Sequence, residues 1–196
     1  MNFEQGIQTL KDRGLNIFLS ARVIDLPENI FTFTDDQKKK TLILIGNGGK
    51  TLWEKIPDFS VQNPIDDFSI SQMKWFGENI LKSDIEILFP DDNQLIPLQQ
   101  LGRFFNLSHQ SPLGIDISNE FGLWFAFRGI MLTDKTIPLK IKPVSTFPCE
   151  SCIDKLCLTT TEINDARLKC PIKIVHQYKS EQRNYHQKVL SNLKMR

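Results

Sequence analysis

Hydrophobic side chains fall into short segments whose spacing changes repeatedly between that of helices and that of strands. Apolar residues recur at helical spacing over residues 2–13, which predicts an opening helix. Compact or alternating apolar runs predict strands at 16–23, 41–45 and 85–89 and a pair at 114–118 and 122–132. Further helices are expected at 63–82, 97–105 and 180–193. Because helices and strands are interspersed without an internal repeat, the pattern predicts an α+β or mixed α/β protein.

Composition narrows the class of protein. Hydrophobic residues make up 40% and charged residues 24% of 196 positions, which is typical of globular proteins and excludes disordered, collagen-like and coiled-coil classes. The longest apolar runs, such as 42–45 and 123–127, are far shorter than the roughly 20 residues of a membrane span. Residues 1–6 lack the basic start of a secretory signal, so we expect a cytoplasmic protein with reduced thiols.

Charge is balanced overall but not along the chain. The formal net charge is +1, whereas residues 167–196 carry eight basic side chains and one acidic side chain. The basic residues are spread out, with only Tyr178 and Tyr185 available to stack on bases, so a solvated helix face is favoured over nucleic-acid binding. A nearby anionic cofactor or cluster would attract the same charge.

A glycine-rich stretch, Gly46-Asn47-Gly48-Gly49-Lys50-Thr51, follows the predicted strand 41–45. It resembles part of a phosphate-binding P-loop, but Leu44 stands where that motif requires its first glycine. The stretch is therefore expected to be a tight turn, and an anion bound by its backbone N–H groups is the alternative.

Four cysteines lie within 22 positions and none occurs elsewhere. They are Cys149, Cys152, Cys157 and Cys170, with Pro148 before the first and Pro171 after the last. Clustered thiols in a reducing compartment are typical of a metal site, because thiolates are soft ligands for zinc and iron–sulfur clusters. The spacing matches neither a bacterial ferredoxin nor a zinc ribbon. A cluster is favoured over zinc, and a site that has lost its metal is the remaining alternative.

The most distinctive segment is the aromatic stretch 121–132. Strict alternation predicts that Trp124, Ala126, Arg128, Ile130 and Leu132 share one face of a strand and that Leu123, Phe125, Phe127, Gly129 and Met131 share the other. An arginine among apolar neighbours has to meet a carboxylate or a ligand anion, because desolvating an unpaired guanidinium costs roughly several kcal/mol of folding free energy.

The order of several motifs resembles that of a known group of proteins. Ser111-Pro112-Leu113-Gly114 precedes Phe121-Gly122-Leu123-Trp124-Phe125-Ala126-Phe127-Arg128-Gly129, and Cys149 to Cys170-Pro171 follow. This order resembles short ferredoxin-type proteins related to epoxyqueuosine reductase and to CblC-type cobalamin-processing proteins. The resemblance covers most of the chain. Thr160-Thr161-Glu162 stand where such relatives carry further cysteines, so four thiols remain for a single cluster.

The resemblance implies a nitroreductase-like α+β sandwich with a C-terminal cysteine-rich segment. It also implies cofactor-binding roles for Arg128 and Trp124, together with Gly129 and Gly114 from the same motifs. Two regions are expected, an α+β core at 1–140 and a segment at 141–196 that holds the metal site and a basic terminal helix.

The leading hypothesis is a ferredoxin-type redox protein that binds one 4Fe–4S cluster through its four cysteines. It would transfer electrons to a small-molecule cofactor or a partner protein, with or without enzymatic activity of its own as an oxidoreductase. The alternatives are a cobalamin-binding or cobalamin-processing module and a zinc-stabilised interaction protein.

Overall fold

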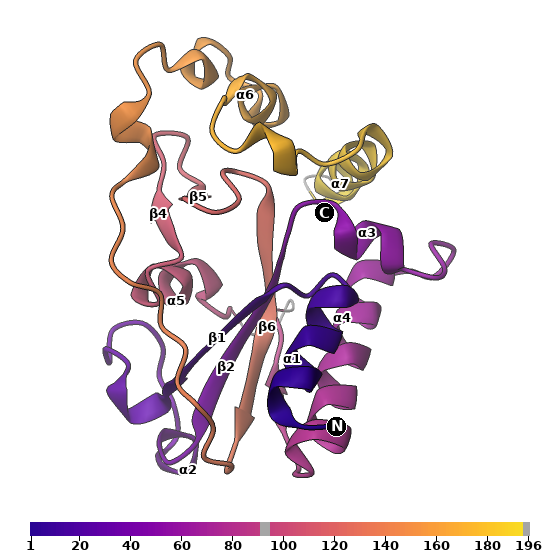
Figure 1. Cartoon of the computed structure of the whole chain (residues 1–196). Helices are drawn as coiled ribbons and strands as arrows, with labels where there is room; N and C mark the ends of the chain where they lie inside the picture. Colours follow the sequence, from indigo (N-terminus) through magenta and orange to yellow (C-terminus); the bar gives the residue numbers. More distant parts are fainter. Residues whose placement is uncertain (91–94, 194–196) are drawn as a thin grey trace.

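The computed structural model describes residues 1–90 and 95–193, with side chains described up to position 188. Its centre is a four-stranded antiparallel sheet in the order β1-β2-β6-β3 (Figure 1). These strands are β1 (Ile17–Arg22), β2 (Thr41–Gly48), β6 (Phe125–Thr133) and β3 (Glu86–Leu88). A separate ribbon pairs β4 (Ser108–Gln110) with β5 (Asp116–Ser118). The α+β class expected from the sequence is therefore confirmed.

Seven α-helices surround the sheet in the described part of the chain. They are α1 (Phe3–Asp12), α2 (Asp35–Lys38), α3 (Thr51–Lys55), α4 (Pro64–Phe76), α5 (Leu98–Phe104), α6 (Ile163–Lys169) and α7 (Ser180–Leu193). A π-helical turn, Gly77–Leu81, extends α4, and short 3-10 turns lie at Val23–Asp25, Pro148–Ser151, Leu156–Thr159 and Ile174–His176. No helix among the described residues has the length and apolar character needed to cross a bilayer.

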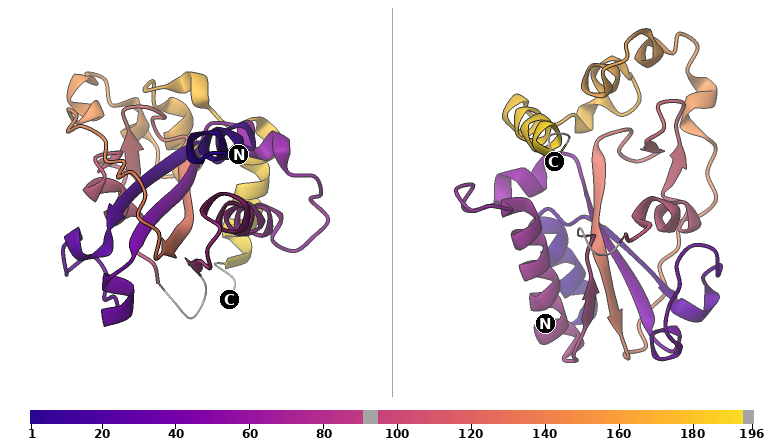
Figure 2. Two further views of the ribbon diagram at one scale, coloured as in Figure 1. Left: turned by 60° about the horizontal axis from the view of Figure 1, so that its bottom comes forward. Right: turned by 180° about the vertical axis from the view of Figure 1, so that it is seen from behind.

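Both faces of the sheet are covered, which explains the continuous apolar run of its central strand. All eight residues of β2 are buried, and its alternate side chains enter two separate clusters. Leu42 and Leu44 pack with α5, whereas Ile43 and Ile45 pack with α1 and α4. Figures 1 and 2 show α1 and α4 together on one side of the sheet and α5 on the other.

Local sequence signals account for the starts of α1 and α4. A reciprocal capping box between Asn2 and Gln5 starts α1, and Pro64 occupies the first turn of α4. Asn63, at the N-terminal cap of α4, makes no side-chain capping hydrogen bond.

The expected tight turn at residues 46–49 is wrong, because β2 continues through Gly48. A Cβ atom on Gly46 would lie 2.7 Å from the carbonyl oxygen of Ala126 on the neighbouring strand. The glycine therefore permits close approach of two strands. The N–H group of Gly49 donates to the carbonyl of Trp124 (2.7 Å), which continues the pairing to the end of the stretch.

The predicted assignment of residues to the two faces of the aromatic strand is wrong after Arg128. Ile45 pairs with Gly129 and Gly46 with Phe127, so Arg128 bulges out of the ladder, and Gly129 adopts a φ of 151°. The bulge reverses the alternation. Phe125 and Phe127 consequently share a face and a cluster with Ile130 and Leu132, which had been expected on the side of Trp124 and Arg128.

The predicted pair of strands at 114–118 and 122–132 is also wrong in its pairing. β5 pairs with β4, whereas β6 begins at Phe125 and pairs with β2 and β3. A single bridge between Ser118 and Gly122 joins the two segments. The resulting turn brings Leu123 and Trp124 into contact with Arg167 of α6, and the Trp124 ring also contacts Tyr178, just before α7.

Candidate functional site

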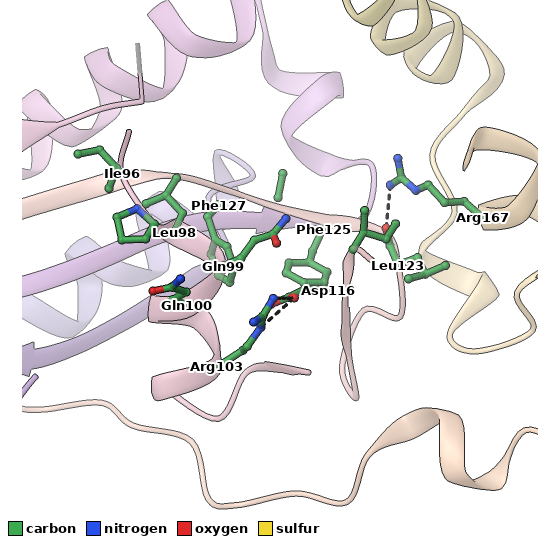
Figure 3. Close-up of a pocket in the computed structure, with 13 residues that line it drawn as sticks. Ile96, Leu98, Gln99, Gln100, Arg103, Asp116, Leu123, Phe125, Phe127 and Arg167 are labelled. Carbon is green, nitrogen blue, oxygen red and sulfur yellow. Dashed lines mark hydrogen bonds and ion pairs between the residues drawn. The ribbon is translucent and has the colours of Figure 1, made fainter. Parts of the chain in front are cut away.

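A cavity of about 610 Å³ lies on the Phe125 and Phe127 face of β6, between α5 and α6 (Figure 3). Its lining mixes apolar side chains with amides and two arginines: Ile96, Pro97, Leu98, Gln99, Gln100, Arg103, Ile115, Asp116, Leu123, Phe125, Ala126, Phe127 and Arg167. This combination of an apolar wall with a few polar groups is typical of small-molecule and cofactor sites.

Arg103 of α5 and Asp116 of β5 form the polar floor of the cavity. An Nη atom of Arg103 lies 2.6 Å from the Asp116 carboxylate, and its Nε also donates to that carboxylate. Ser108 donates a further hydrogen bond of 2.7 Å to the same carboxylate, whose side chain is only 3% exposed. Asp116 is thus fully partnered, and it fixes the orientation of the more exposed Arg103 at the edge of the cavity.

Arg167 of α6 lines the opposite end of the cavity (Figure 3). Its Nη2 donates to the carbonyl of Leu123 (2.7 Å), and its guanidinium carbon lies 4.7 Å from the ring centre of Trp124. Burial lowers the pKa of Arg167 and the nearby Tyr178 partly offsets this, although the two side chains make no well-oriented hydrogen bond. Arg167 therefore connects the cavity with the buried side chains under α7.

The four cysteines are free thiols that come from three separate turns. Cys149 lies in the turn Pro148–Ser151 and Cys152 directly follows it, Cys157 lies in the turn Leu156–Thr159, and Cys170 ends α6. Cys170 is buried, whereas the other three are half-buried. Three of the thiols, those of Cys149, Cys157 and Cys170, pack with Ile117 and Leu123 in one apolar cluster.

The thiols are close enough to influence each other's protonation. Burial, together with the negative charge of Cys170, Cys157 and Cys152, raises the pKa of Cys149 to about 11. Burial also raises the pKa of Cys170, while a hydrogen bond from the backbone of Ile172 acts in the opposite direction. The protein alone thus favours neutral thiols, and a bound cation would stabilise the thiolates.

The four cysteines match a soft metal in donor type, but their side chains are not closed around one ion. Among residues 1–90 and 95–193, no group of three or more His, Cys, Asp or Glu side chains is placed to hold a metal ion. Four thiolates around one tetrahedral zinc would stand about 3.8 Å apart, given zinc–sulfur bonds of about 2.3 Å. Iron–sulfur clusters contain several metal ions and separate their thiolates further.

The residues predicted to bind a cofactor do not line the cavity. Arg128 and Trp124 lie towards α4 and α7, Gly129 forms the bulge, and Gly114 lies in an exposed turn. Arg128 donates through Nε to Asn47 (2.7 Å), and its Nη1 lies 3.8 Å from the Asp66 carboxylate. Its predicted encounter with a carboxylate is thus confirmed in part.

The sequence reasoning missed Arg103, Asp116 and Arg167. One signal was present, because Asp116 lies between two isoleucines in a predicted strand and an acidic residue at such a position requires a cationic or hydroxyl partner. Nothing local to Arg103 or Arg167 identifies that partner or the cavity.

No family model matches the chain, and no curated protein matches it significantly. Among solved structures, the chain is similar to epoxyqueuosine reductase from Streptococcus thermophilus, with a TM-score of 0.50 and 15% sequence identity. The similarity covers 81% of this chain and 52% of that chain, so this chain spans about half of the reductase's length. At this identity the similarity concerns the fold. It supports the epoxyqueuosine reductase part of the resemblance, whereas no comparison supports the ferredoxin or CblC part.

Proposed function

We propose that the chain is a redox protein in which Cys149, Cys152, Cys157 and Cys170 hold one 4Fe–4S cluster. The observation that carries the proposal is the proximity of these thiols: those of Cys149, Cys157 and Cys170 pack in one apolar cluster, and the charge of Cys152 acts on Cys149. Buried neutral thiols also pack as small apolar groups, so the support for a metal comes from the proximity of several thiols and not from their burial. When bound, such a cluster accepts and donates single electrons.

The chain's own residues would control access to the cluster. Cys170 is 4% exposed, and its neighbours Ile117 and Leu123 exclude water from that side of the site. The backbone of Ile172 lies close enough to lower the pKa of the Cys170 thiol. Hydrogen bonds to ligating sulfurs stabilise the more negative, reduced form and so raise the reduction potential of such a site.

The cavity would hold the electron acceptor. Leu123 and Ile115 belong both to the cavity lining and to the apolar cluster around the cysteines, so the two sites share a wall. Arg167 lines the cavity only three positions before Cys170. An acceptor in the cavity would therefore lie next to the thiols without displacing any of them.

The same cavity favours a second candidate, a cobalamin-binding or cobalamin-processing module. Its aromatic wall, formed by the edge-to-face rings of Phe125 and Phe127, and the amides of Gln99 and Gln100 suit part of a large cofactor with polar edges. Addition of cobalamin should then change its visible spectrum in proportion to the protein, and Gln99→Trp, which fills the cavity, should abolish that change. An unchanged spectrum would rule out this candidate.

Analysis of iron, zinc and acid-labile sulfide in protein purified without oxygen tests the main proposal. We expect about four iron and four sulfide per chain, with the broad visible absorbance of iron–thiolate bonds. Cys170→Ser should abolish both, whereas Ser151→Ala, in the same stretch, should retain them.

Two results would contradict the cluster. Zinc at one ion per chain without sulfide would favour the zinc-stabilised interaction protein, and stability should then fall on chelation. Protein that contains neither metal nor sulfide after anaerobic purification and chemical reconstitution would show that the thiols no longer bind a metal.

A further inference from the structure

Unpartnered polar groups collect in one place under α7. Among the described residues, six buried side-chain atoms have no hydrogen-bond partner. They belong to residues that we call the polar cluster: Asn47 (Nδ2), Trp124 (Nε1), Arg167 (Nε), Tyr178 (OH), Gln182 (Oε1) and His186 (Nε2). Buried polar groups in folded proteins nearly always have a partner, so six exceptions together indicate a missing partner.

Direct contacts join four members of the polar cluster, namely Trp124, Tyr178, His186 and Arg167. The rings of Trp124 and Tyr178 are 5.4 Å apart, and those of Tyr178 and His186 are 5.7 Å apart. The Arg167 guanidinium lies against both aromatic rings, at 4.7 Å from Trp124 and 5.3 Å from Tyr178. Asn47 accepts a hydrogen bond from Arg128, whose charge acts on Tyr178 and His186 of the cluster. Trp124, Asn47, Tyr178 and Gln182 are each at most 3% exposed.

The unpartnered atoms are mainly hydrogen-bond donors. Trp124 Nε1 and Arg167 Nε can only donate. Asn47 accepts from Arg128 through its amide oxygen, so its remaining amide nitrogen is also a donor. Tyr178 and His186 can each donate, depending on hydroxyl rotation and tautomer, and a flipped amide would make Gln182 a donor as well. The missing partner is therefore an acceptor.

The charge in this region points to a negative acceptor. Arg128, with a side chain 10% exposed, and Arg167 both border the cluster. In the described chain, the carboxylate that pairs with either arginine is that of Asp66, which lies 3.8 Å from Arg128 and is 42% exposed. Burial lowers the pKa of both arginines, and burial together with their charge lowers the pKa of His186 to about 4. Positive charge in the region is only partly neutralised.

We propose that the polar cluster binds one small oxyanion, the group shared by phosphates and carboxylates, between β6, α6 and α7. Trp124, Arg167 and Tyr178 donate to its oxygens, Asn47 donates from the end of β2, and Arg128 contributes the second positive charge. Such charge-assisted hydrogen bonds satisfy buried donors that water would satisfy less strongly. The site is independent of the four cysteines and of the cluster proposed for them.

Thermal unfolding of the full chain, at constant ionic strength, tests this site with three separate salts. Sodium phosphate and sodium acetate are titrated against sodium chloride, since an anion that binds only the folded chain raises the unfolding midpoint in a saturable way. A shift with phosphate alone or with acetate alone identifies which oxyanion the site prefers. Equal shifts with all three salts would overturn the proposal.

Matched variants locate the effect. Trp124→Phe keeps the ring but loses the donor, and it should weaken binding of the preferred anion by about tenfold or more. Trp53→Phe, on the half-buried side of α3 against Phe59, should keep the wild-type affinity. Tyr178→Phe provides a second donor deletion in case Trp124→Phe fails to fold. Retention of the full anion response in a folded donor-deleted variant would overturn the proposal.

Discussion

The central sheet and the cysteine segment, residues 141–176, bury their side chains to very different extents. Every residue of β2 is buried, whereas in the cysteine segment only Pro148, Ala166 and Cys170 are. Ile153 and Val175 in that segment are 94% and 80% exposed. Buried apolar area is large enough to stabilise the sheet. The cysteine segment buries much less apolar area, so we expect its turns to need another source of stabilisation. A metal site supplies that missing stabilisation in many small cysteine-rich units.

The largest expected effect is that of Cys170→Ser, which should alter one of these two regions and not the other. Cys170→Ser should leave the sheet folded and should release the cysteine segment, because the cluster proposed for the four thiols loses a buried ligand. Limited proteolysis followed by mass spectrometry should then find cuts between residues 141 and 176 that the wild-type protein resists. Val175→Ala, at an exposed position, is the control. An unchanged cleavage pattern would mean that apolar contacts alone hold the segment.

Truncation of an aliphatic side chain to alanine should lower the stability greatly in the sheet and very little in the cysteine segment. Leu44→Ala removes a fully buried side chain from the sheet and should lower the free energy of unfolding by about 3 to 5 kcal/mol. Ile153→Ala should change it by less than about 0.5 kcal/mol, because that side chain is 94% exposed. Urea unfolding measures both, and similar losses would contradict the comparison.

Acid should weaken the attachment of α7 to the sheet through His186. Its pKa falls from 6.5 in the unfolded chain to about 4 in the folded protein, so the unfolded chain binds the proton first. Stability should therefore be constant above about pH 6.5 and fall by about 3 kcal/mol as the pH decreases to about 4. His186→Gln should flatten this part of the profile, which urea unfolding at several pH values measures. An equally steep profile in His186→Gln would assign the effect to other groups.

The smallest expected effect concerns the bulge in β6. Gly129→Ala should cost about 1 to 3 kcal/mol, because φ is 151° and a Cβ would lie 3.2 Å from the carbonyl oxygen of Leu88. Gly114→Ala also meets a positive φ, 77°, but no atom within 4 Å, so its cost should be about 1 kcal/mol. Equal losses in urea unfolding would show that the bulge tolerates a side chain as well as an open turn does.

Periodicity predicted most of the elements because their signals are local. The spacing of Ile7 and Leu10 identifies α1, and the unbroken apolar run at 41–45 identifies most of β2. The end of β2 and the bulge at Arg128 depend on how two strands meet across about 80 residues of sequence, and no local pattern records that pairing. The alternation rule therefore failed at the position where the partner strand changes register.

The candidate site was only partly predictable for the same reason. Cysteine type and clustering identify four related thiols from the sequence alone, since no fold is needed to see that they are neighbours. The cavity is different, because Arg103 and Arg167 come from helices far apart in the chain and reach it only after the sheet has formed. The polar cluster likewise assembles from β2, α6, α7 and the segments just before β6 and α7.

The bulge at Arg128 and Gly129 also governs how this chain should be compared with others. Before the bulge the odd-numbered residues of β6 face the core cluster of Leu42 and Leu44, and after it the even-numbered residues do. A gap-free alignment with a relative that lacks the extra residue would therefore match residues on one face of the sheet with residues on the other. Residues 125–127 and 130–133 therefore require separate superposition. At 15% identity, an error of one position in this strand is enough to hide a genuine correspondence between two proteins.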